Sequence, residues 1–255
     1  MRSIWNGAIS FGLVSIPIQL FSASEEDRID LNMLDRRDKS QIRYKRINEK
    51  TGKEVPWKNI VKGFKKDDHY VILEDKDFER ANLKKSKTIA IQEFVKETEV
   101  ADVLFKKPYF MKPQKEAGKS YQLLNEALKK TKKFGVATFV MRQKEHLCLI
   151  GTYQKTLVLY LIRFAHELRS PKELKIPKEK VSEKELNMAV SLIKEYTTKF
   201  DFKQYKDVYN EQLMDIINKK DKGEKIKSED FVDQPTESSD LLSKLKASLE
   251  KKKAS

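Results

Sequence analysis

The stretch MRSIWNGAISFGLVSIPIQLF, residues 1–21, is almost free of charge and is the most apolar part of the chain before residue 130. Four apolar residues share odd positions, namely Trp5, Ile9, Phe11 and Leu13. The next four share even positions, namely Val14, Ile16, Ile18 and Leu20, with Gly12 at the change. Since strand side chains alternate between two faces, a change of parity beside glycine indicates a tight turn or bulge between paired strands. The stretch therefore predicts a β-hairpin in a core. A secretory signal is the alternative, but polar residues interrupt the apolar run and its basic start is thin.

Charge is the unusual feature of the composition. Lys and Arg number 53 against 39 Asp and Glu, so the formal net charge is +14, and charged residues make up 36% of the 255 residues. This balance favours a polyanionic partner, either a nucleic acid or an anionic membrane surface, over a surface that is merely basic and soluble. The hydrophobic fraction of 39% still permits a sizeable core, in one large domain with appendages or in two small domains.

The chain has a single cysteine and no long apolar run. Cys148 lies between two leucines, so we expect a small core residue rather than a nucleophile. One cysteine excludes an intramolecular disulfide and points to a reducing compartment. No run approaches eighteen apolar residues, so we expect no membrane-spanning helix. The predicted location is the cytoplasm, in association with the nucleoid.

Several further stretches predict strands. Apolar side chains alternate with cations over residues 41–47, and Thr51-Gly52 marks a turn, so we predict a basic hairpin over 41–55. Residues 106–113 are bounded by prolines, which suits an edge strand or a barrel corner. The densest apolar region, 134–164, divides at two polar turns into three strands of an antiparallel meander. With the two hairpins, these strands are enough to close a barrel.

Helical spacing appears between the strands and after them. Apolar residues three and four apart predict a helix over 117–133. Short helical pieces are expected at 57–64 and 76–83, and the strands beside them at 69–73 and 88–97.

The character of the chain changes after Ser170. Ser182 and Glu185 form a plausible capping box at the start of one helix, and a second helix is predicted from about Gln204 to Lys220. Their apolar stripes exceed what two helices can bury against each other, so they should pack on the core or on another subunit. Residues 221–237 lack periodicity and predict a linker. An apolar stripe then follows, at Leu241, Leu242, Leu245 and Leu249.

These observations predict three regions. Residues 1–170 form a β-barrel core, 171–222 form a helical arm, and 223–255 combine a linker with a short C-terminal helix.

Motifs of the common catalytic and cofactor sites are missing from the sequence. There is no phosphate-cradling glycine loop and no nucleophile elbow, and the three histidines belong to no cluster with metal-ligand spacing. His166-Glu167 could be an acid–base pair, but an ion-paired strand terminus explains these residues as well. We therefore predict no catalytic residue, cofactor or metal. An enzyme with an unrecognised motif stays as an alternative, which product formation with a divalent metal would reveal.

Cations, in contrast, lie where a binding surface could use them. Lys and Arg neutralise DNA phosphates without reading sequence, and no recognition-helix, zinc-finger or single-strand motif is present. Binding to the backbone of duplex DNA is therefore the best interpretation. The candidate DNA-binding residues are Arg43, Lys45, Arg46, Lys53, Lys106, Lys107, Arg142 and Lys144.

One resemblance adds to this interpretation. Residues 2–14, RSIWNGAISFGLV, closed by Ile16-Pro17, resemble the opening of the bacterial Ku proteins, which bind double-strand DNA ends. Similarity continues to about Tyr209. It is carried by residues 42–46, 51–55, 121–128, 141–147 and 161–169, and residues 239–254 resemble the short C-terminal helix of the family.

The resemblance implies a mixed β/α fold, with a Ku-like β-barrel core, bridging loops, a C-terminal helical arm and a short flexible tail. It implies that the core over 1–170 binds DNA and that the arm over 171–222 serves dimerisation. The product is a homodimeric ring threaded by duplex DNA, without catalytic activity. It also implies recruitment of a multi-domain end-joining DNA ligase through the C-terminal segment that carries the leucine stripe. The tail from Lys219 holds ten lysines and eight acidic residues, so an additional DNA-binding role for it is not expected. A basic structural or RNA-associated protein without end specificity is the alternative.

Overall fold

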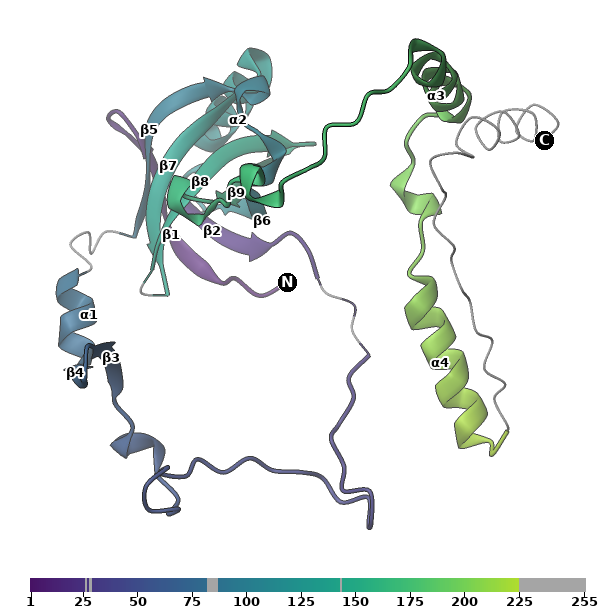
Figure 1. Cartoon of the computed structure of the whole chain (residues 1–255). Helices are drawn as coiled ribbons and strands as arrows, with labels where there is room; N and C mark the ends of the chain where they lie inside the picture. Colours follow the sequence, from purple (N-terminus) through teal and green to yellow (C-terminus); the bar gives the residue numbers. More distant parts are fainter. Residues whose placement is uncertain (26, 28, 82–86, 143, 225–255) are drawn as a thin grey trace. The chain divides into compact units, whose positions relative to one another are not determined.

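The computed structural model describes residues 1–25, 27, 29–81, 87–142 and 144–224 (Figure 1). The chain divides into two compact units, Met1–Ser170 and Pro171–Ser255. Seven strands of the first unit form a closed barrel in the order β1-β2-β6-β9-β8-β7-β5. They are β1 (Trp5–Phe11), β2 (Val14–Ser22), β5 (Thr88–Lys96), β6 (Phe105–Pro113), β7 (Lys133–Met141), β8 (Lys144–Tyr153) and β9 (Thr156–Ile162).

The N-terminal hairpin is confirmed. Phe11 pairs with Val14 across a two-residue turn, and Gly12 has φ +55°, as a type II′ turn requires at its first central position. The even-numbered residues Ile16, Ile18 and Leu20 are fully buried. Leu13, by contrast, is fully exposed. It does not belong to the odd-numbered face of β1, because it occupies the turn itself.

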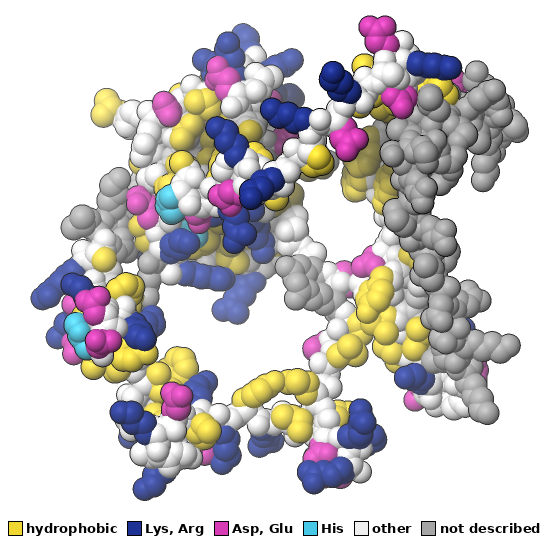
Figure 2. Space-filling model, viewed as in Figure 1, with side chains coloured by type: hydrophobic (Ala, Val, Ile, Leu, Met, Phe, Trp, Pro, Cys, Tyr) yellow, Lys and Arg dark blue, Asp and Glu magenta, His cyan; other side chains and the backbone are white. Residues whose placement is uncertain are grey.

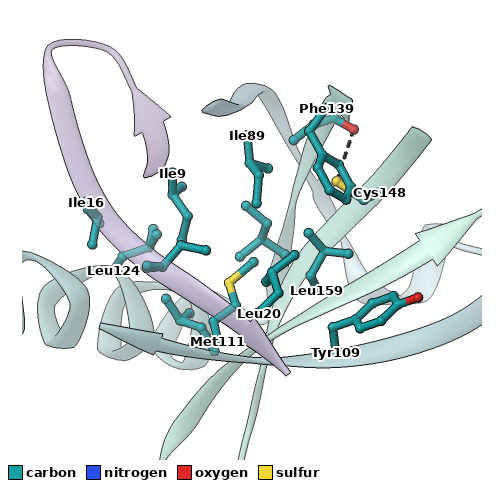
Figure 3. Close-up of a cluster of buried hydrophobic side chains, with 14 of the residues drawn as sticks. Ile9, Ile16, Leu20, Ile89, Tyr109, Met111, Leu124, Phe139, Cys148 and Leu159 are labelled. Carbon is teal, nitrogen blue, oxygen red and sulfur yellow. Dashed lines mark hydrogen bonds between the residues drawn. The ribbon is translucent and has the colours of Figure 1, made fainter. Parts of the chain in front are cut away.

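The core fills the interior of the barrel (Figure 3). Strand residues such as Ile9, Ile89, Met111 and Leu159 are almost completely buried. Cys148 belongs to the same cluster, as predicted, and its thiol donates a hydrogen bond to the Ala137 carbonyl at 3.4 Å. Burial raises the pKa of that thiol, so it is a core side chain and not a nucleophile.

Helix α2 (Gly118–Thr131) covers the end of the barrel between the end of β6 and the start of β7. Its apolar stripe, Tyr121, Leu124 and Leu128, is buried, as the spacing predicted. The Tyr121 hydroxyl donates to the Met111 carbonyl and accepts from the Leu157 amide, both at 2.7 Å. These bonds fix the helix to two strands of the barrel.

The meander β7-β8-β9 is antiparallel, as predicted. Strand β6 is not an edge, because it pairs with β2 on one side and with β9 on the other. Its prolines are tolerated for local reasons. Pro108 follows a register shift between Phe105 and Lys107, and Pro113 is the last residue of the strand. A missing N–H costs least at a bulge or at a strand end.

A long excursion, residues 23–87, leaves the barrel after β2 and returns at β5 (Figure 1). It contains β3 (Lys62–Lys66), β4 (His69–Leu73) and α1 (Asp75–Ala81). The strand predicted at 69–73 and the helix at 76–83 are thus present over their described residues. The helix predicted at 57–64 is only a 3₁₀ turn, Trp57–Asn59, followed by β3.

The predicted basic hairpin over 41–55 contributes no strand to the barrel. Its strand pairing consists of two isolated antiparallel bridges, one between Ile47 and Glu54 and one between Gln41 and Leu34, which precedes the segment. Alternating side chains make a strand where one face is buried, but no described residue of the excursion is buried. Tyr44, one of the alternating apolar residues, is 81% exposed.

The second unit contains α3 (Glu183–Tyr196) and α4 (Val208–Asp221). The predicted capping box is present: Ser182 Oγ accepts from the Glu185 amide, and Glu185 accepts from the Ser182 amide. Helix α4 begins later than predicted, at an Asp207 cap. No described residue of this unit is buried. The leucine stripe at 241–249 lies outside the described residues, and no described helix has the length and apolar character to span a membrane.

Candidate nucleic-acid interface

Four predicted cations meet at one end of the barrel. Strand pairing places the start of β6, the end of β7, the start of β8 and the end of β9 together, because Phe105 and Leu147 both pair with Ile162, and Met141 pairs with Lys144. We call this group the cationic rim. It comprises Lys106, Lys107, Arg142 and Lys144.

Glu167 lies among the rim cations. Its 3₁₀ turn, Ala165–Glu167, begins three residues after the last residue of β9, Ile162. Glu167 Oε2 accepts from Lys106 Nζ at 2.7 Å and from the Phe164 amide at 2.8 Å, and Oε1 is 4.0 Å from Lys144 Nζ. The hydrogen bond from Lys106, followed by that from Phe164, lowers the pKa of Glu167 to about 2. The ion-paired strand terminus is therefore the correct interpretation of His166-Glu167, and His166 stacks instead on Phe164.

Arg163 binds the backbone just before Lys106. Its Nη1 donates to the carbonyl of Val103 at 2.8 Å and to that of Phe105 at 2.6 Å. These bonds tie the end of β9 to the start of β6, next to Lys106. Hydrogen bonds from a charged donor are stronger than neutral ones, so this contact fixes where the Lys106 stem begins.

Arg142 and Lys107 lie around Tyr109. Burial raises the pKa of Tyr109, and the nearby positive charge of Arg142 acts in the opposite direction. Lys107 Nζ is 6.0 Å from the centre of the Tyr109 ring. Arg142 has φ +53°, an uncommon conformation for a residue other than glycine. The tight β7–β8 turn imposes it.

His146 adds little positive charge to the rim, because its pKa is lowered. It lies against Phe139, with ring centroids 5.8 Å apart. Burial lowers its pKa, and the charges of Lys144 and Lys106 act in the same direction. The lowered pKa favours the neutral form of the imidazole, so the positive charge of the rim comes mainly from the lysines and the arginine.

Both ends of the excursion emerge at the cationic rim. At its start, the Ala23 amide donates to the carbonyl of Pro108, the residue after Lys107. At its end, the Lys87 carbonyl accepts from the Ala8 amide at 2.9 Å. The Lys87 carbonyl and the Trp5 ring both lie against Gly7, since a Cβ added at Gly7 would come within 2.2 Å of each. The Trp5 indole in turn donates to Val140, two residues before Arg142.

The excursion carries the other four predicted cations. Lys45 pairs with Glu54 at 2.8 Å, and the Arg46 guanidinium lies 4.5 Å from the centre of the Trp57 ring. Lys53 closes the turn that begins at Asn48, whose amide donates to the Lys53 carbonyl. Arg43 is exposed in the same segment. Figure 2 shows cations beside hydrophobic side chains along the excursion, and further cations at the end of the barrel from which it leaves.

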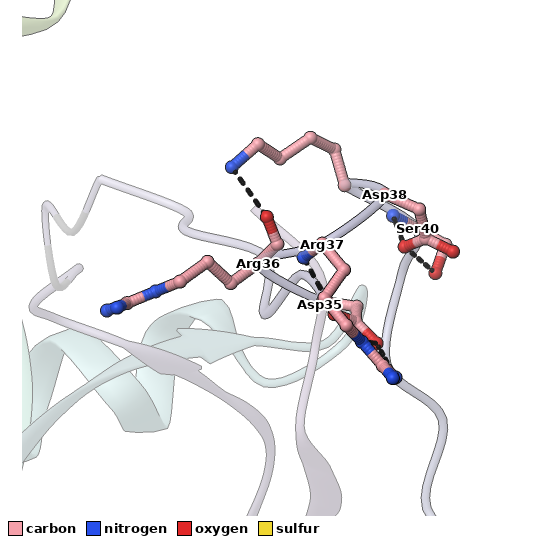
Figure 4. Close-up of polar contacts among 6 residues, drawn as sticks. Asp35, Arg36, Arg37, Asp38 and Ser40 are labelled. Atoms are coloured by element: carbon pink, nitrogen blue, oxygen red, sulfur yellow. Dashed lines mark hydrogen bonds and ion pairs between the residues drawn. The ribbon is translucent and has the colours of Figure 1, made fainter.

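A second charged segment of the excursion is a turn at residues 35–40 (Figure 4). Arg37 donates to both carboxylate oxygens of Asp35, and Asp38 accepts from the amide and hydroxyl of Ser40. The Arg37 bonds lower the pKa of Asp35. Arg36 points away from these contacts in Figure 4. The turn is thus held by its own charges and presents one outward arginine.

The structure therefore brings the predicted cations together in two groups, four at the rim and four in the excursion. No described contact joins a member of one group to a member of the other. Sequence reasoning missed the part of Glu167 in the rim, because its lysine partner is 61 positions away and only strand register brings them together. Among the described residues there is also no cluster of His, Cys, Asp and Glu that could hold a metal ion.

Known proteins resemble the chain over most of its length. The family model of the Ku70/Ku80 beta-barrel domain matches residues 10–188. The non-homologous end joining protein Ku of Coxiella burnetii is 36% identical over 260 residues, which cover 98% of this chain and 95% of the relative. The protein of the same name from Archaeoglobus fulgidus is 36% identical, with 98% and 99% covered. That of Opitutus terrae is 38% identical, with 86% and 80% covered.

Proposed function

This chain belongs to the Ku family, and from that premise we propose that it binds the ends of double-stranded DNA in non-homologous end joining, without sequence preference. The observation that carries the proposal is the position of the excursion. Both of its ends emerge at the rim that bears Lys106, Lys107, Arg142 and Lys144. A cationic rim and a cationic loop that starts and ends beside it suit a duplex held between them.

The chemistry of these side chains suits phosphates rather than bases. Lysine and arginine neutralise backbone phosphates and release condensed counterions, a term that does not depend on sequence. Arg43, Lys45, Arg46 and Lys53 supply the same chemistry from the excursion. Specific reading of bases uses a helix or ribbon in the major groove, and the eight candidate cations lie on turns, strand ends and an irregular loop.

We propose that two copies of the chain together form a ring around the duplex. Helices α3 and α4 expose much of their apolar surface: Leu186 is 56% exposed, Ile193 66% and Val208 55%. Helices of this length depend on packing for their stability, so we propose that the arms of two subunits cover each other. A homodimer of two barrels with their excursions then encircles the duplex.

The tail has a separate role in this proposal. Leu241, Leu242, Leu245 and Leu249 would form one face of a short helix, and a short amphipathic helix acquires stability by lying in a groove of a partner. We propose that this face recruits and stimulates a multi-domain end-joining DNA ligase, since the chain itself carries no catalytic motif. Replacing Leu242 and Leu245 with Asp should leave DNA binding intact and remove the stimulation of ligation.

Because its proposed substrate is chromosomal DNA, we propose that the protein works in the cytoplasm, at the nucleoid. The test of the proposed ring uses the topology of the DNA. Phosphates attract a basic surface equally on circular and on linear DNA, whereas a closed ring loads only from an end. We expect retention on linear duplex DNA, and loss from relaxed circular DNA of the same length, in salt high enough to suppress loose association. Equal retention on both forms, or equally tight binding of structured RNA, would leave a basic structural or RNA-associated protein.

A further inference from the structure

Glu167 is the acidic residue in contact with the rim lysines. The Phe164 amide donates to its Oε2 at 2.8 Å and so holds the carboxylate in place. The same oxygen accepts from Lys106 Nζ at 2.7 Å, and Oε1 lies 4.0 Å from Lys144 Nζ. An anion therefore already lies between two cations that the proposed function assigns to DNA phosphates.

We propose that Glu167 limits the affinity of the cationic rim for DNA, because it occupies the place of a backbone phosphate beside Lys106 and Lys144. The inference rests on the proposed function. Each phosphate that a protein neutralises strengthens binding through counterion release. A lysine that is already paired with a carboxylate causes less counterion release when it binds a phosphate. The rim therefore binds DNA with fewer effective charges than it has cations.

The contacts indicate that the duplex has to share these lysines and does not displace the acid. Glu167 stays ionised at neutral pH, since its pKa of about 2 lies far below 7. Its bond to the backbone holds it in place, whereas the lysine stems are flexible. Lys144 is the more accessible of the pair, with 66% of its side chain exposed against 32% for Lys106. A weaker grip at the rim would let a threaded protein move along the duplex after loading.

The test is Glu167→Gln, which keeps an oxygen to accept from the Phe164 amide and removes the charge. We expect binding to linear duplex DNA about five to ten times tighter at 0.1 M salt, with the slope of log K against log salt steeper by about 0.9, the value for one additional phosphate. The matched control is Glu126→Gln. Glu126 lies on α2, at the other end of the barrel, and accepts only from Gln122 among its described side-chain contacts.

Lys106→Gln separates a local effect from a gain in net charge. In the wild-type background it should reduce the salt slope by clearly less than one unit, and in the Glu167→Gln background by about one unit. Unchanged or weaker binding by Glu167→Gln, or an equal gain from Glu126→Gln, would overturn the inference while leaving the proposed function intact. Failure of the wild-type protein to bind duplex DNA would instead remove the proposed function and the inference with it.

Discussion

Arg142 combines a proposed DNA contact with a backbone conformation that most side chains avoid. Its φ of +53° places it in the left-handed region, which glycine, asparagine and aspartate occupy most readily. An alanine at this position would remove the cation and keep the strain, so its effect on binding would be mixed with an effect on folding. Asparagine removes the charge and suits the turn.

Arg142→Asn should therefore weaken binding to every duplex alike. The salt slope should fall by about 0.9, since one phosphate contact is lost. Fluorescence anisotropy over a salt series, on two unrelated sequences, measures both quantities, with Arg142→Lys as the control that retains charge. A loss confined to one of the two sequences would mean that Arg142 reads a base.

Glu167 should make the stability of the protein depend on pH in the acidic range. Its pKa of about 2 in the folded state lies below the ordinary value of 4.5, chiefly because Lys106 donates to it. A depressed folded pKa stabilises the fold above the ordinary value, and the benefit disappears as pH falls from about 4.5 towards 2. Between pH 6 and pH 3, the melting temperature of Glu167→Gln should fall less than that of the wild type. An equal fall in both proteins would contradict the ion-pair account.

Among the elements, α2 is attached to the barrel by the side chain of Tyr121. Tyr121→Phe leaves the Leu157 amide, a buried donor, without this acceptor, and an unsatisfied buried donor costs about 1 to 3 kcal/mol. Chemical denaturation should show a loss of that size. Tyr44→Phe is the control, because its exposed hydroxyl contacts only Met33 among the described contacts. A Tyr121→Phe protein as stable as the control would mean that water replaces the hydroxyl.

Sequence pattern predicted the elements that bury one face, and it misled where nothing is buried. The change of parity at Gly12 and the α2 spacing both describe surfaces that contact the core, so the hairpin and the helix were predictable. The alternation around Tyr44 has the same form, but the excursion has no core to contact. The local pattern cannot tell these two cases apart, since burial depends on what the rest of the chain supplies.

The candidate site was predictable as a set of cations and not as an arrangement. Lys106, Arg142 and Lys144 stand out by charge and by their positions at strand ends. Their meeting at one end of the barrel depends on the strand order β6-β9-β8-β7, and the contact of Lys106 with Glu167 depends on the turn after β9. Pairing order is a property of the whole sheet, which single-stretch periodicity does not contain.

At the scale of the whole molecule, the proposed dimer depends on the arms α3 and α4. Leu186→Asp together with Ile193→Asp should produce a monomer and remove DNA binding, because charges would replace the apolar surface proposed to lie between subunits. Analytical ultracentrifugation at micromolar concentration measures the first effect. Asn187→Asp with Ser191→Asp adds the same charge on another face of α3 and should leave the dimer intact. A folded monomer of the unmodified chain at that concentration would exclude the proposed ring.

The barrel closes through a short parallel seam. Only Ala8, Ile9 and Ser10 of β1 pair with β5, and their partners are Thr88, Ile89 and Ala90, eighty positions later. The meander β7-β8-β9, by contrast, joins neighbours in the chain. Contacts between distant residues form late, since a long loop has to be ordered first. We expect the meander to assemble early and the seam to close last. In the finished protein, the amides at the seam should exchange with deuterated solvent before those of the meander.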